Sequence, residues 1–118
     1  MLEVQQFNHV SVVGLQGELS RRNVHVLDEV LSSLAKCDQR NVVLNMADLE
    51  HIDYRLVKRI AERIIEFQCD GGDLKMAAAS GYIKSILQAM GLDGVIYPSL
   101  AEALLSFVGG SVPDGDPL

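Results

Sequence analysis

Four of the ten basic residues fall within nine consecutive positions, and this is the most informative group in the sequence. They are Arg55, Lys58, Arg59 and Arg63. Because Arg55, Arg59 and Arg63 recur every four residues, they would line one stripe of an α-helix. The chain has a formal net charge of −6, so such a stripe would contrast with the rest of the molecule and attract an acidic partner. An equally weighted interpretation is a solvated face on which Glu62 and Glu66 pair with these cations.

Two other places offer groups that can act on a ligand. Ser80 and Gly81 precede a predicted helix whose unpaired N–H groups can hold an anion, although a serine at this place more often only caps the helix. His51 and Asp53 can supply a base or two metal ligands, but no third ligand is near in sequence, and we interpret them as solvated loop residues. The sequence has no phosphate-binding loop, dinucleotide-binding glycine motif or nucleophile elbow. We therefore expect no enzyme activity, no metal and no cofactor.

Length and composition restrict the class of protein. The chain has 118 residues, 48% of them hydrophobic, which is enough for one domain that folds alone. Its net charge argues against binding to nucleic acid or to an anionic membrane. No apolar run reaches the roughly 18 residues of a membrane span, and the first residues lack a signal-peptide pattern, so we expect a cytoplasmic protein without membrane insertion. Cys37 and Cys69 form no C-x-x-C motif and are interpreted as reduced thiols.

The apolar pattern predicts strands and helices that alternate along the chain. The expected strands cover 2–7, 10–13, 41–46, 74–79 and 95–97, and the expected helices cover 24–36, 54–66, 83–90 and 100–107. This order predicts an α/β domain with a mixed, largely parallel sheet covered by about four helices. We expect a single domain at 1–108 and a flexible tail at 109–118, since Gly109 and Gly110 would end the last helix. Any site is expected in the loops that follow the strands, such as 48–53.

Four segments together resemble the STAS domain, which is the domain of bacterial anti-sigma factor antagonists. They are residues 10–19, 41–53, 71–77 and 86–93. The resemblance runs from about residue 2 to residue 108, with the order and spacing of all elements kept. It implies a STAS-like fold and a non-enzymatic module that acts by binding a protein partner.

In that family the segment after the third strand reads Ile-Asp-Ser-Ser-Gly-Leu, and the second serine, or a threonine in its place, is phosphorylated by a kinase of the anti-sigma type. This chain keeps Ile52 and Asp53 but has Tyr54, Arg55 and Leu56 in place of Ser-Ser-Gly. Arg55 thus stands at the phosphoacceptor position. The resemblance therefore predicts no serine phosphorylation there, and it replaces a group that would gain about −1.5 to −2 charges with a fixed cation.

The resemblance implies binding to an anti-sigma factor, a serine kinase or a related ATPase, and with it a role in partner switching and transcription regulation. We expect the contact surface around the helix start after residue 53. It comprises Asp53, Tyr54, Arg55, Leu56, Lys58 and Arg59. Asp53 has a second interpretation as the N-cap of that helix. Two alternatives are a STAS subunit of a transporter ATPase or sensory complex, and a small anion- or nucleotide-binding domain. Homodimer formation is left open.

Overall fold

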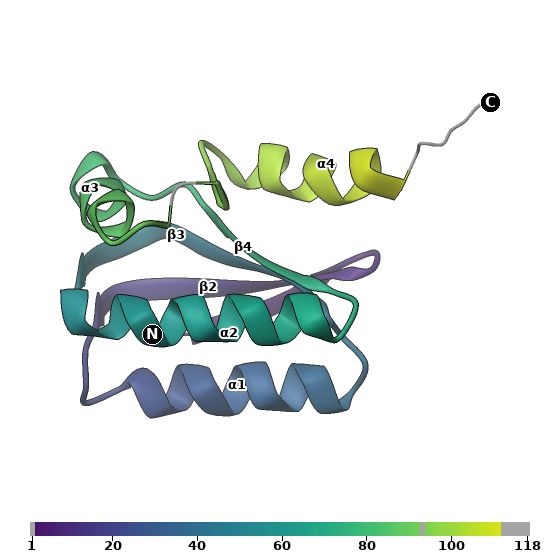
Figure 1. Cartoon of the computed structure of the whole chain (residues 1–118), viewed down its shortest axis with the longest axis horizontal. Coiled ribbons are helices and arrows are strands. Elements are labelled where there is room, and N and C mark those ends of the chain that lie inside the picture. Colours follow the sequence, from purple (N-terminus) through teal and green to yellow (C-terminus); the bar gives the residue numbers. More distant parts are fainter. Residues whose placement is uncertain (1, 93, 112–118) are drawn as a thin grey trace.

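Strands and helices alternate along the chain in the computed structural model, which describes residues 2–92 and 94–111 (Figure 1). The elements are, in order, β1 (Leu2–Phe7), β2 (Val10–Leu19), α1 (Val24–Lys36), β3 (Asn41–Ile52), the 3₁₀ turn η1 (Tyr54–Leu56), α2 (Val57–Cys69), β4 (Asp73–Ala77), α3 (Gly81–Ala89), β5 (Ile96–Tyr97) and α4 (Leu100–Ser111). Within these residues, four α-helices and a five-stranded sheet confirm the predicted α/β class.

The sheet has the strand order β1-β2-β3-β4-β5. β1 runs antiparallel to β2, and all later neighbours are parallel. β3 is central, and its Val42, Val43 and Leu44 have no exposed area because helices cover both faces of the strand. The carboxyl ends of the parallel strands meet at one edge of the sheet. The turns that leave β2, β3 and β4 there position the candidate site.

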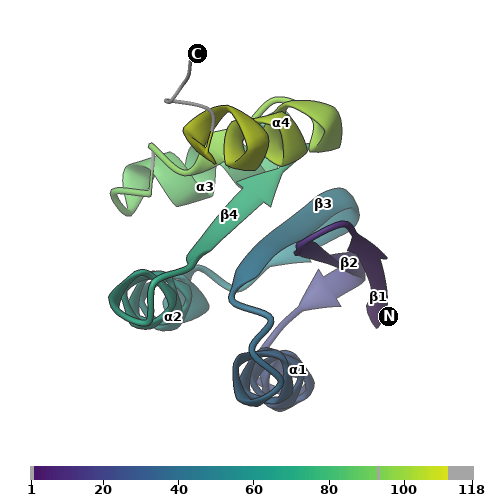
Figure 2. The same cartoon turned by 90° about the vertical axis from the view of Figure 1, so that its right-hand side faces the viewer.

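Side chains of the sheet alternate between two hydrophobic clusters. α1 and α2 lie on one side of the sheet and α4 lies on the other (Figure 2). Leu44 and Met76 belong to the larger cluster, which includes residues of α1 and α2, whereas Val43 and Ala77 belong to the cluster with α4. α3 adds Ile83 to the larger cluster. The turns at the carboxyl edge are therefore attached to a packed core, which limits their movement.

β3 is longer than the sequence predicts. Residues 48–53 were expected to form a loop, but the strand continues to Ile52. The reason is its pairing with β2, whose register runs on to Leu19 opposite Ile52 through two irregularities. Backbone hydrogen bonds to a neighbouring strand thus extend β3 where its side chains become polar. The predicted helix 54–66 likewise begins with the turn η1, and α2 follows it to Cys69.

Two other boundaries differ from the expected ones. β4 ends at Ala77 instead of continuing to residue 79, because Ala78 has a φ of 62°, outside the range of a strand. α4 continues through Gly109 and Gly110 to Ser111, so these glycines do not end the helix as expected. The rest of the predicted tail, 112–118, lies outside the described residues. None of the helices in the described ranges has both the length and the apolar character needed to cross a membrane.

Candidate functional site

Asp53 fixes the turn that follows β3. Its backbone N–H donates to the carbonyl of Leu19 at 2.9 Å, which ties the end of β3 to β2. Its carboxylate Oδ1 accepts a hydrogen bond from the backbone N–H of Arg55 at 3.0 Å, so Asp53 caps η1. The interpretation of Asp53 as an N-cap is thus confirmed. Because the cap satisfies an N–H that the first helical turn leaves unpaired, it holds η1 and the start of α2 in one position.

The side chain of Arg55 folds back onto the same carboxylate. Its Nε donates to Oδ1 at 3.0 Å and its Nη2 donates to Oδ2 at 2.8 Å, and we call this two-point ion pair the Asp53–Arg55 clamp. Hydrogen bonds from the Arg55 side chain and backbone lower the pKa of Asp53 from its ordinary 3.8 to about 2, and the charge of Arg21 acts in the same direction. Asp53 raises the pKa of Arg55 in turn. The Arg55 side chain is still 56% exposed, so a partner can reach its guanidinium.

The Asp53–Arg55 clamp makes the folded protein sensitive to acid. The pKa of Asp53 is lower in the folded protein than in the unfolded chain, so the stability that the clamp contributes is fully present above about pH 4 and is lost as the pH falls toward 2. We expect the free energy of unfolding to fall over this range in the wild type, and to fall less steeply in Arg55→Met. Urea unfolding at several pH values measures both slopes, and equal slopes would contradict this role of the clamp.

The side chains on either side of Arg55 point in opposite directions. Tyr54 is 61% exposed. Leu56 is only 5% exposed and packs in the larger core cluster, because η1 leads into an amphipathic helix whose apolar stripe must face the sheet. Leu56 is therefore not a surface contact, which corrects that part of the predicted partner-binding set. Lys58, in the first turn of α2, is exposed as expected.

A contact between His51 and Tyr82 extends the site toward α3. Tyr82 Oη and His51 Nδ1 lie 2.8 Å apart, and the two rings stack with centroids 5.8 Å apart. Both side chains are exposed, Tyr82 to 53%. The interpretation of His51 as a solvated loop residue is wrong in part, because it lies in β3 and binds Tyr82. Sequence reasoning missed Tyr82, although it directly follows the expected loop at Ser80 and Gly81.

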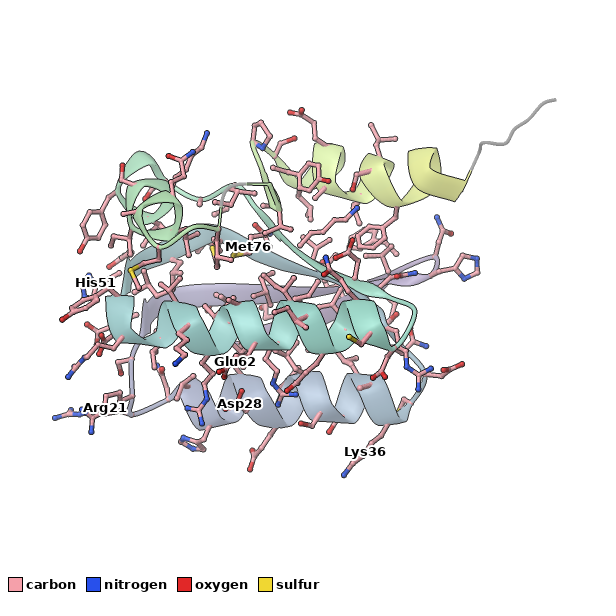
Figure 3. All side chains as sticks on the ribbon, in the orientation of Figure 1. Arg21, Asp28, Lys36, His51, Glu62 and Met76 are labelled. Atoms are coloured by element: carbon pink, nitrogen blue, oxygen red, sulfur yellow. The ribbon has the colours of Figure 1, made fainter. Side chains whose placement is uncertain are left out.

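Cationic and aromatic side chains thus gather at the carboxyl edge of the sheet. Arg21, in the turn between β2 and α1, lies at the same end of the molecule as His51 (Figure 3). Its charge helps to lower the pKa of Asp53 in the Asp53–Arg55 clamp. No pattern in the sequence indicated Arg21, because Asp53 lies 32 positions further along the chain. We define the carboxyl-end surface as Arg21, His51, Tyr54, Arg55, Lys58 and Tyr82.

Arg59 and Arg63, the C-terminal part of the basic stripe, join α2 to α1. Arg63 donates to Asp28 Oδ1 at 3.3 Å, to the carbonyl of Asp28 at 2.9 Å and to Ser32 Oγ at 2.9 Å. Arg59 pairs with Asp28 Oδ2 at 3.2 Å, and Arg63 also pairs with Glu66 at 3.3 Å. For Arg63 the alternative of a salt-bridged face is therefore confirmed, with Asp28 as a partner that the sequence did not indicate. Arg59 is still half exposed and remains a predicted contact.

Ser80 has a structural role at the start of α3. Its Oγ accepts a hydrogen bond from the backbone N–H of Ile83 at 3.2 Å, so it caps the helix. The simpler interpretation of Ser80 is confirmed, and anion binding at Ser80 and Gly81 stays a prediction. In the described part of the chain, no three His, Cys, Asp or Glu side chains come together as metal ligands.

A protein-family model matches most of the chain. The model of the STAS domain matches residues 1–103 of the chain. The chain is a member of the STAS domain family. This membership confirms the resemblance that the sequence segments indicated. It also places the Asp53–Arg55 clamp inside the matched region.

Solved structures share the STAS fold over most of the chain. An anti-sigma factor antagonist from Mycobacterium paratuberculosis has a TM-score of 0.79 at 21% identity, covering 90% of this chain and 92% of that chain. SpoIIAA from Bacillus, in its unphosphorylated form, has a TM-score of 0.72 at 18% identity, covering 95% and 99%. The murine anion transporter Slc26a9 has a TM-score of 0.71 at 17% identity, covering 89% of this chain but 18% of the transporter. At these identities the similarity shows a shared fold.

Proposed function

We propose that this STAS domain is a non-enzymatic regulatory module of the cytoplasm that binds an anti-sigma factor or a related ATPase-fold kinase through the carboxyl-end surface. The observation that carries the proposal is the Asp53–Arg55 clamp. It fixes a guanidinium next to the exposed ring of Tyr54 in the free protein, so less side-chain entropy is lost when a partner binds. Tyr and Arg are also the residue types that most often dominate the binding energy of interfaces.

The charge of the carboxyl-end surface favours an acidic patch on the partner. Arg21, Arg55 and Lys58 supply positive charge at one end of a chain whose net charge is −6. The exposed Glu18 lies opposite His51 in the β2–β3 register and limits this positive region on the β2 side. An acidic partner would be attracted to this end of the molecule and repelled elsewhere, which orients the encounter.

The proposed module lacks the serine switch of its family. SpoIIAA has been solved in both a phosphorylated and an unphosphorylated form. In this chain the position that corresponds to the phosphoacceptor holds Arg55, whose guanidinium pairs with Asp53. We infer that the partner is bound constitutively, or is released by a signal other than phosphorylation of a serine in η1.

Absence of the switch predicts an all-or-none difference in phosphate uptake. After incubation with ATP and the kinase of a captured partner, wild-type protein should gain no phosphate, whereas Arg55→Ser should gain one, because a hydroxyl then stands at the start of a helix where a kinase of this family acts. Intact-mass spectrometry detects the added phosphate. One phosphate on the wild type, or none on Arg55→Ser, would contradict this part of the proposal.

A transporter partner is the second candidate, favoured by the similarity to Slc26a9. Affinity capture from the source organism separates the two, with the wild-type domain as bait and mass spectrometry as the readout. Enrichment of an ATPase-fold anti-sigma protein supports the first proposal. Enrichment of a membrane transporter supports the second, and capture of neither would overturn both.

A further inference from the structure

A groove at the opposite end of the molecule from the carboxyl-end surface has features of a small-molecule site. It has a volume of about 410 Å³ and lies between the β1–β2 hairpin and α4. Its walls include the apolar side chains of Phe7, Leu104 and Phe107, and Asn8, His9 and Asn41 supply polar groups. Ligand sites commonly have about 300–1,000 Å³ and combine apolar walls with a few polar groups. The groove therefore has the size and composition of a site for a compact ligand.

A buried cation lies behind one wall of this groove. Lys75, on β4, is 9% exposed, and its Nζ lies 4.0 Å from the ring centroid of Phe107 and 5.4 Å from that of Tyr97. The Nζ donates to Ser106 Oγ at 2.7 Å. Within residues 2–92 and 94–111, no carboxylate forms an ion pair with Lys75. Its positive charge is therefore balanced only by the rings and the hydroxyl, and it acts on what binds nearby.

The charge of Lys75 and the side chains that line the groove together indicate the chemical class of a ligand. Among the described residues that line it, none is an Asp or Glu whose carboxylate would repel an anion. A planar aromatic body can stack against Phe7 and Phe107, since aromatic rings prefer offset-stacked and edge-to-face contacts. The side-chain amides of Asn8 and Asn41 carry N–H donors suited to a carboxylate. We propose that the groove binds a small aromatic carboxylate, with its ring against the phenylalanines and with Lys75 favouring the anionic form.

The probe pair 2-naphthoate and 2-naphthamide tests this proposal, because the two share a ring system and differ in charge. In titrations of ¹⁵N-labelled full-length protein, 2-naphthoate should shift the backbone amides of residues 7–10, 41 and 104–107. It should bind about tenfold more tightly than 2-naphthamide, since a cation in a low-dielectric environment acts at short range. Phe7→Glu should abolish this binding, whereas Val4→Glu, an exposed residue of the same strand outside the groove, should leave it unchanged.

A second variant isolates the charge. Lys75→Met should make the affinities for 2-naphthoate and 2-naphthamide equal, with folding checked by circular dichroism; if this variant does not fold, Phe7→Glu and the probe pair still decide. Shifts at other residues, no binding at millimolar 2-naphthoate, or equal affinities in the wild type would overturn the proposal. Sedimentation that shows a wild-type dimer and a Phe7→Glu monomer would also overturn it, because a second copy would then occupy the groove.

Discussion

Arg55→Glu is expected to weaken binding of the captured partner by about 100-fold, because a charge pair that a complex buries leaves the partner's charge unpaired when one member is removed. The substitution acts in two ways. It removes the Asp53–Arg55 clamp, so that two carboxylates lie close together at the start of η1, and it places a negative charge where an acidic partner would dock. Biolayer interferometry with the immobilised domain measures the loss.

Arg40→Glu is the matched control for this charge change. Arg40 also pairs with an aspartate two positions before it, Asp38, but lies at the other end of β3. Arg40→Glu should leave the affinity for the partner unchanged. Tyr54→Ala should weaken binding while Ile65→Ala, which trims a similarly exposed side chain on α2, should not. Equal affinity of Arg55→Glu and the wild type, with both folded, would contradict the assignment of this surface.

Gly72→Ala is expected to destabilise the fold by about 3 kcal/mol, the upper range for inserting a group into packed structure. Gly72 ends the turn between α2 and β4, and a Cβ at this position would collide with the carbonyl and Cβ of Arg40. The same close approach allows the Asp73 N–H to donate to the Arg40 carbonyl at 2.9 Å, at the start of the β3–β4 pairing. The added methyl group must push β4 away from β3.

Thermal unfolding measures this effect, with an expected fall in Tm of about 10 °C for a domain of this size. Gly81→Ala is the control, because a Cβ at this first residue of α3 meets no atom within 4 Å. It should be neutral or slightly stabilising, since alanine favours a helix more than glycine does. A Gly72→Ala variant that melts with the wild type would contradict the described contact between the two turns.

The element order followed from the sequence because side-chain periodicity is a local property. The buried strand at 41–46 and the helix stripe after residue 56 were both visible as patterns of apolar residues. The ends of the strands and helices were not visible in the sequence, because they depend on neighbours distant in sequence. β3 continues past residue 46 because residues 16–19 of β2 pair with it. α4 likewise passes through two glycines that would usually end a helix.

The candidate site was predicted only where its contacts join residues that are close in sequence. Asp53 and Arg55 are two positions apart, so a cap and a local ion pair were within reach of sequence reasoning. The pairing of Arg63 with Asp28 spans 35 positions, and only the packing of α1 beside α2 reveals it. The contact between Tyr82 and β3 likewise depends on the β3–β4 topology.

Hydrogen exchange of the domain in complex with its captured partner shows whether the carboxyl-end surface is the binding site. We expect slower exchange on binding at residues 19–23, 51–58 and 81–84, which carry the carboxyl-end surface, and unchanged exchange in the β1–β2 hairpin and α4. This result would place the partner at the Asp53–Arg55 clamp. Protection confined to the hairpin, α4 or the outer face of α1, with none at 51–58, would contradict binding at the carboxyl-end surface.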